Sequence, residues 1–139
     1  MPRRPNRRAD IETATANNGV VRVLLAEDND DLRMVMPALI DGIDGLQCAA
    51  TTAYLEEVGP LIARHQVAVA VLDIELRGGS ALKRLPDLRR EFPDTRFVIH
   101  SGHSNPELVR QAQSAGASAY VLKSGDFDDL IAAIRGLAA

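Results

Sequence analysis

Five short apolar runs, separated by stretches with helical spacing, constrain the fold of this sequence more than any other feature. The runs are Val20–Ala26, Leu46–Ala50, Val67–Leu72, Phe97–Ile99 and Ala119–Leu122. Continuous apolarity of this kind is typical of strands covered on both faces, as in a parallel sheet. Gln47 interrupts the second run, which suits a strand at the edge of the sheet.

The segments between the runs place apolar residues at helical spacing. The first segment, behind an Asn29-Asp30 cap, shows Leu32, Val35, Met36, Leu39, Ile40 and Ile43. The third shows Leu82, Leu85, Leu88 and Phe92, and the last shows Phe127, Leu130, Ile131, Ile134 and Leu137. The fourth begins with Asn105-Pro106, a cap followed by proline at the first helical position.

Three prolines fall inside predicted helices: Pro37, Pro60 and Pro86. Each removes one backbone hydrogen bond and favours a bend. Gly59-Pro60 interrupts the pattern of the second helix, expected around Tyr54–His65, whereas Pro37 is expected on the solvent side of the first helix.

Strands alternating with helices predict an α/β fold of five βα units with right-handed crossovers. The expected architecture is a doubly wound (βα)5 parallel sheet with the flavodoxin-like strand order 2-1-3-4-5, whose switch point lies between strands 1 and 3. The 139 residues fit a single domain. We expect a disordered basic tail over residues 1–20 and the folded domain over residues 21–139.

Charge and cysteine content disfavour several classes of function. Four arginines and two acids give residues 1–21 a net charge of +2; since the whole chain carries −3, the remainder carries −5. Such an acidic domain is a poor general binder of nucleic acid. Cys48 is the single cysteine, so no intramolecular disulfide forms, and a cytoplasmic location is expected. No apolar run reaches the roughly 18 residues of a membrane span.

Polar residues follow four predicted strands where each strand ends: Glu27-Asp28, Asp73, Ser101 and Lys123. Each alone has an ordinary explanation, as acids near a helix N-terminus, a loop aspartate, a turn serine or a surface lysine. In the predicted strand order, however, all of these ends line one crevice, where ligands bind in open α/β folds. Their coincidence on four strands favours a common site.

The chemistry of these residue types explains the combination. Gathered carboxylates repel one another unless a cation joins them. Mg²⁺ suits a few carboxylates plus water and phosphate oxygens. One carboxylate can then attack phosphorus and become an acyl phosphate. Lys123 would offer a positive charge and Ser101 a hydroxyl to the other phosphoryl oxygens.

The set Glu27-Asp28, Asp73, Ser101, Tyr120 and Lys123 resembles that of response-regulator receiver domains, from about Val21 to the C-terminus. The segments VRVLLAEDN, AVLDIEL, FVIHSG and AGASAYVLK are similar to receiver segments as well. The resemblance implies phosphorylation of Asp73 by a histidine kinase or phosphotransfer protein. It also implies Mg²⁺ on Glu27, Asp28, Asp73 and the backbone carbonyl of Glu75.

The same resemblance assigns phosphate binding to Ser101 and Lys123, and a conformational switch to Ser101 and Tyr120. Glu75 and His103, each two residues beyond a site residue, are expected to set the lifetime of the acyl phosphate. His100 is expected to be a strand residue without a catalytic role. The sequence ends after the fifth helix without a DNA-binding domain, so we expect a stand-alone receiver that signals by protein binding through residues 105–139. Its oligomeric state is left open.

Three positions depart from the usual receiver pattern: Arg77 in place of proline, Ala81 in place of glycine, and Ser124 in place of the proline after the lysine. The Lys123–Ser124 bond is therefore expected to be trans. One alternative is a degenerate receiver that acts as a phosphate-independent docking scaffold. Another is a haloacid-dehalogenase-like phosphatase, but there the nucleophile precedes the acidic pair, whereas Glu27-Asp28 precedes Asp73.

Overall fold

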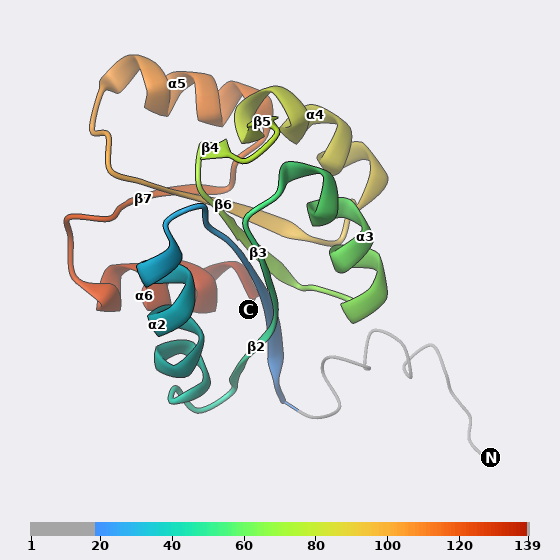
Figure 1. The fold of residues 1–139 in the computed structure, drawn as a ribbon, viewed down its shortest axis with the longest axis vertical. Coiled ribbons are helices and arrows are strands. Elements are labelled where there is room, and N and C mark those ends of the chain that lie inside the picture. Colours follow the sequence, from blue (N-terminus) through green and yellow to red (C-terminus); the bar gives the residue numbers. More distant parts are fainter. Residues whose placement is uncertain (1–18, 139) are drawn as a thin grey trace.

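The computed structural model describes residues 19–138, and the predicted basic tail lies almost wholly outside them. Strands and helices alternate along the chain and form three layers (Figure 1). Five strands make one parallel sheet: β1 (Val21–Ala26), β2 (Leu46–Thr52), β3 (Val69–Leu72), β6 (Arg96–Ser101) and β7 (Ala119–Leu122). Their order, β2-β1-β3-β6-β7, confirms the predicted 2-1-3-4-5 arrangement with β2 at an edge.

Helices cover both faces of the sheet. On one side lie α2 (Asp30–Asp41) and α6 (Phe127–Ala138), and on the other α3 (Leu55–His65), α4 (Ala81–Glu91) and α5 (Pro106–Ala115) (Figure 1). Each face has its own apolar core, because side chains alternate along a strand. Leu24 belongs to the core beneath α3, α4 and α5, whereas Leu25 belongs to the core beneath α2 and α6.

Two helix starts follow the predicted capping chemistry. The Asn29 side chain accepts a hydrogen bond of 3.0 Å from the backbone N–H of Leu32 at the start of α2. Asn105 accepts one of 2.8 Å from the N–H of Glu107, and Pro106 occupies the first turn of α5. These bonds satisfy helix N–H groups that lack an intrahelical partner.

The interruption expected at Gly59-Pro60 does not occur, since α3 runs unbroken from Leu55 to His65. Pro60 is exposed, so water can reach the carbonyl group that loses its helical partner. Gly59 is buried; a Cβ atom there would lie 3.7 Å from the ring of Phe92 and 3.8 Å from Leu88. Tertiary packing against α4 thus holds a helix that its local sequence disfavours.

The apolar face predicted for α2 is wider than the face that is buried. Met36 and Ile40 are buried, but Val35 and Leu39 are 54% and 46% exposed. Met34 is exposed too, at 79%. The helix lies near an edge of the sheet, over β1 and β2, so a narrow stripe suffices to cover it.

A short antiparallel hairpin after β3 was not predicted. It pairs β4 (Glu75–Leu76) with β5 (Gly79–Ser80), and Gly78 and Gly79 have φ angles of +102° and +150°. Glycine adopts such angles without the steric cost of a side chain. Arg77 at the hairpin tip donates its N–H to the Ala53 carbonyl at 2.9 Å and accepts from the N–H of Leu55 at 2.9 Å.

Across residues 19–138, every helix is too short and too polar to cross a bilayer. Cys48, on β2, is a free thiol whose pKa burial raises to about 11. At neutral pH it therefore remains a protonated, weakly reactive side chain.

Two methionines of α2 provide a matched test of the buried stripe. Met36→Ala should lower the free energy of unfolding by about 2–4 kcal/mol, because Met36 is 4% exposed and its loss leaves a cavity. Met34→Ala, on the same helix, should change it by less than about 0.5 kcal/mol. Urea unfolding of both variants measures the difference, and equal losses would contradict the observed orientation of α2.

Candidate functional site

The alternation of side chains along the strands brings three charged residues to one side of the sheet. The core beneath α2 and α6 takes Leu25 from β1, Val71 from β3 and Val121 from β7. Two residues further along each strand, the side chain points to the same side of the sheet again. These next positions are Glu27, Asp73 and Lys123, so their meeting follows from strand register.

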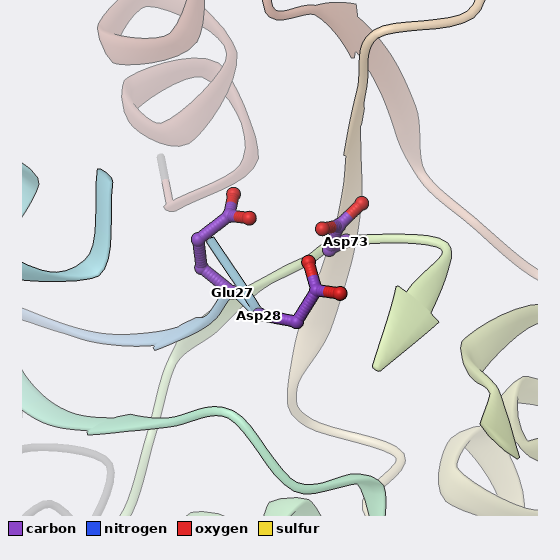
Figure 2. Close-up of side chains that lie close together, drawn as sticks. All are labelled: Glu27, Asp28 and Asp73. Atoms are coloured by element: carbon purple, nitrogen blue, oxygen red, sulfur yellow. The ribbon is translucent and has the colours of Figure 1, made fainter. Parts of the chain in front are cut away.

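Glu27, Asp28 and Asp73 form a cluster of carboxylates at the ends of β1 and β3 (Figure 2). One oxygen of each lies within 4.8 Å of the others. Glu27 is 1% exposed and Asp28 is more open to solvent. Three acidic oxygens at this separation fit a hard divalent cation.

Lys123 connects two members of this cluster. Its Nζ lies 2.9 Å from Oε1 and 3.0 Å from Oε2 of Glu27, and 3.1 Å from Oδ2 of Asp73. The backbone N–H of Lys123 donates to the Ser101 carbonyl at 2.7 Å, which fixes the end of β7 against β6. The ammonium group therefore partly neutralises the acids.

Burial and the neighbouring acids raise the pKa values of two of the three carboxyl groups, Asp73 and Asp28. Burial, followed by the neighbouring Glu27, raises the pKa of Asp73 above its ordinary value, although the charge of Lys123 opposes this. The pKa of Asp28 is also raised, mainly by its hydrogen bond with Asp73 and then by burial. Burial alone would lower the pKa of Lys123, but its contacts with Glu27 and Asp73 outweigh burial and raise it.

Backbone and side-chain donors hold Glu27 in place. The N–H of Asn29 donates to Glu27 Oε2 at 3.0 Å, and Arg33 Nη1 donates to the Glu27 carbonyl at 2.9 Å. Arg33 was not predicted from the sequence, where its only signal is a basic residue one turn into the helix that follows the acidic pair.

Ser101 and Tyr120 lie toward the opposite side of the sheet, and the backbone of His103 links them. Ser101 is 1% exposed, and its Oγ accepts a hydrogen bond of 3.0 Å from the His103 N–H. The Tyr120 hydroxyl donates to the His103 carbonyl at 2.7 Å. The two predicted switch residues, Ser101 and Tyr120, thus bind the N–H and the carbonyl of the same loop residue, His103.

Glu75 is separate from the carboxylate cluster. It lies in β4, two residues beyond Asp73, with its side chain exposed and its backbone paired with Ser80. The part predicted for Glu75 in metal binding concerns its backbone carbonyl, so the side chain is free to face solvent.

A family model described as the response regulator receiver domain matches residues 23–135. The chain belongs to this family. Receiver domains are signalling domains of two-component systems, which sets aside the phosphatase alternative.

Among curated relatives, the chain is 29% identical to the transcriptional regulatory protein MctR of Rhizobium johnstonii, over 85% of this chain and 55% of MctR. It is 28% identical to the DNA-binding transcriptional activator DevR/DosR of Mycobacterium tuberculosis, over 86% of this chain and 55% of that protein. The chain spans about half the length of the curated relatives it matches.

Solved structures of receivers share the fold. A two-component response regulator of the LuxR family from Aurantimonas has 27% identity and a TM-score of 0.80, covering 86% of this chain and 85% of that one. A DNA-binding response regulator of the LuxR family from Staphylococcus aureus has 26% identity and a TM-score of 0.80, covering 86% of this chain and all of that one.

Arg77, where receivers usually have proline, connects three loops around the site. Its Nη2 lies 3.0 Å from Oδ1 of Asp30 in the first turn of α2, and its guanidinium carbon lies 5.7 Å from the centre of the Tyr54 ring. Asp30 also pairs with Arg33 at 2.5 Å. Together with the backbone bonds at the hairpin tip, these contacts hold the loop that follows Asp73.

The departure at Ser124, the third of the three, behaves as expected. Within the described part of the chain no peptide bond is cis, so the Lys123–Ser124 bond is trans.

His100 was predicted to be a strand residue, and it is one, but its environment is unusual. It is 8% exposed in β6, and its Nδ1 is the one buried side-chain nitrogen or oxygen among residues 19–138 that lacks a hydrogen-bond partner. Burial lowers the pKa of His100 to about 4, and the charge of Lys123 acts in the same direction. The imidazole is therefore neutral near pH 7.

The raised pKa of Asp73 gives stability a pH dependence of definite sign. An unfolded aspartate titrates near about 3.9, whereas folded Asp73 keeps its proton to higher pH. Between these pKa values the folded state binds more protons, so stability falls as pH rises. Without divalent cations, Asp73→Asn should reduce this fall, because it removes the titration of Asp73 and also the charge that helps to raise the pKa of Asp28. Urea unfolding at pH values between the unfolded and folded pKa values of Asp73 measures how the free energy of unfolding changes with pH. Asp94→Asn, in an exposed loop, is the control. An unchanged profile in Asp73→Asn would contradict the assignment.

Proposed function

We propose that this receiver accepts a phosphoryl group on Asp73 from the phosphohistidine of a histidine kinase or phosphotransfer protein. It then signals through binding to a protein. The observation that carries the proposal is the cluster of three carboxylates within 4.8 Å, two of which contact Lys123. A cytoplasmic location is part of the proposal and accords with the free thiol of Cys48.

In the transfer step, an Asp73 carboxylate oxygen attacks phosphorus and forms an O–P bond. The P–N bond to the donor histidine breaks, and the imidazole keeps the electron pair and takes up a proton. Glu27, Asp28, Asp73 and the Glu75 carbonyl would hold Mg²⁺, which offsets the charge of the acids and the phosphoryl oxygens. Such an offset would also oppose the rise in the pKa of Asp73, because a nearby cation favours the charged carboxylate.

Lys123 and Ser101 are proposed to bind the transferred group. Lys123 already contacts the acceptor carboxylate at 3.1 Å, so its ammonium needs little movement to contact a phosphoryl oxygen on Asp73. Ser101 can donate its hydroxyl hydrogen while its Oγ remains an acceptor for the His103 N–H.

The lifetime of the acyl phosphate is proposed to depend on Glu75 and His103. Both side chains are exposed beside the strand ends, Glu75 on the short strand β4 and His103 on the loop after β6, two residues beyond Asp73 and Ser101. From there they can help or hinder a water molecule that attacks phosphorus. The rate of dephosphorylation is the quantity that substitutions at these residues are expected to change.

The alternative is a receiver that binds its partner without phosphate. A docking scaffold has no need for three gathered carboxylates, and the raised pKa values of Asp28 and Asp73 mark an energetic cost of keeping them charged. The complete cluster therefore favours phosphoryl transfer.

Incubation with acetyl phosphate and Mg²⁺ should add one phosphate to the wild-type chain, detected by mass spectrometry of the intact protein. Asp73→Asn should take none, because an amide is not a nucleophile for this reaction. Asp94→Asn serves as the matched control and should react as wild type does. A full adduct on Asp73→Asn would refute the assignment, and no adduct on wild type would favour the scaffold.

The output surface is proposed to be residues 105–139, which include α5, β7 and α6. Phosphate on Asp73 would draw Ser101 toward it, and Ser101 is linked through the His103 backbone to Tyr120 on β7. A move of Ser101 would therefore release or shift the Tyr120 hydroxyl at the edge of this surface. The surface is polar, with Glu107 paired to Arg110 at 2.6 Å, which suits reversible binding.

Contacts with the phosphoryl group can supply the free-energy difference between the two conformations that such a switch requires. Moving a conformational balance from 1:99 to 99:1 needs about 5.5 kcal/mol. Hydrogen bonds to a charged group contribute about 1.5–3 kcal/mol each. Bonds from Lys123 and Ser101 to the phosphoryl group would supply much of this difference if they form in one state only.

Hydrogen exchange with and without beryllofluoride, a mimic of the phosphoryl group, tests the output route. Protection should change in α5 and β7 as well as in the loops around Asp73. Tyr120→Phe, which lacks the hydroxyl that contacts His103, should weaken the change in β7 while leaving the loops around Asp73 responsive. Changes confined to those loops would exclude this route.

A further inference from the structure

His100 stands in the same row of side chains as the site residues. The core beneath α2 and α6 contains Val98 of β6, and His100 follows it by two residues, as Asp73 follows Val71 and Lys123 follows Val121. In the sheet, β6 lies between β3 and β7. His100 therefore lies on the strand between the acceptor Asp73 and Lys123, on the same side of the sheet.

The charges of Asp73 and Lys123 both act on the imidazole of His100. Lys123 and Asp73 are the two charged residues whose fields act on His100. Glu27, the other partner of Lys123, lies further along the row on β1. His100 is thus part of the electrostatic environment of the site, although none of the proposed steps uses it.

The unpaired Nδ1 calls for an explanation. Buried polar groups in folded proteins nearly always have a partner, and one without a partner costs stability. A neutral imidazole has one N–H donor and one nitrogen acceptor. At 8% exposure, His100 presents a buried acceptor or donor beside a cationic side chain.

Lys123 is the partner that the arrangement can supply. Its ammonium group has three N–H donors, and in this structure they are directed at Glu27 and Asp73. A divalent cation on the same carboxylates would compete for the Glu27 oxygens, which frees a donor of Lys123. Two strands lie between β1, which ends at Glu27, and β7: β3, which is followed by Asp73, and β6, which is adjacent to β7 and carries His100.

We propose that His100 is a positioning residue for Lys123: its Nδ1 accepts a hydrogen bond from the Lys123 ammonium group while Lys123 contacts the phosphoryl group on Asp73. The inference rests on the proposed phosphorylation of Asp73. In this arrangement His100 never touches the phosphoryl group; it fixes the direction of the cation that does.

The first test is the ¹⁵N NMR spectrum of the full chain with labelled histidine. Addition of Mg²⁺ and beryllofluoride should move the His100 Nδ1 resonance from the free to the hydrogen-bonded position of a neutral imidazole. His65, at the far end of α3, should not respond. ¹⁹F NMR reports bound beryllofluoride independently, so Lys123→Met can be compared at equal occupancy and should show no movement of His100. An unmoved Nδ1 resonance in wild type, or an equal shift in Lys123→Met, would overturn the proposal.

The second test is the rate of phosphorylation by acetyl phosphate at saturating Mg²⁺. His100→Leu should react about tenfold more slowly, which corresponds to one hydrogen bond to a charged group. His100→Asn keeps an acceptor and should recover part of the rate, and His65→Asn should leave it unchanged. A structural role alone would change thermal stability but not the rate per folded molecule.

The outcomes separate the two proposals. If wild type gains no phosphate on Asp73, the proposed function fails and the role of His100 fails with it. If wild type is phosphorylated and His100→Leu reacts at the same rate, only the role of His100 is refuted.

Discussion

The contact of Lys123 with Glu27 and Asp73 is the interaction on which the rest of the site depends. Three carboxylates at the ends of β1 and β3 lie within 4.8 Å of one another. Burial, followed by the neighbouring Glu27, raises the pKa of Asp73, and the hydrogen bond with Asp73, followed by burial, raises the pKa of Asp28. One ammonium group offsets only part of this charge. The folded protein therefore keeps an unfavourable concentration of negative charge, which a bound divalent cation would relieve.

The site residues lie on both faces of the sheet. Glu27, Asp73 and Lys123 project toward α2 and α6, whereas Ser101 and Tyr120 belong to the side of α3, α4 and α5. Alternation along β6 and β7 is what separates them, since neighbouring residues on a strand point in opposite directions. In β6, His100 on one face is therefore followed directly by Ser101 on the other.

The sequence was sufficient to predict the fold and the grouping of Glu27, Asp28, Asp73 and Lys123, because parallel strands end at one edge and their polar residues follow the apolar runs. It was not sufficient for features that depend on tertiary packing. Val35 and Leu39 fit the helical stripe of α2, yet they are exposed, because α2 covers an edge of the sheet. The hairpin after Asp73, and the burial of His100 without a partner for Nδ1, depend on contacts between segments distant in the chain.

The loop after Asp73 is held differently from the loops of receivers that have proline at the position of Arg77. A proline ring restricts the backbone covalently, and dissolved salt has no influence on it. Here part of the restraint comes from Arg77 and Asp30, whose side chains are 43% and 68% exposed. Exposed ion pairs are worth at most about 1 kcal/mol and weaken as the screening length shrinks from about 8 Å at physiological ionic strength to about 3 Å at 1 M salt. The order of this loop is therefore partly a property of the surrounding electrolyte, whereas the two backbone hydrogen bonds to Ala53 and Leu55 do not depend on exposed charges.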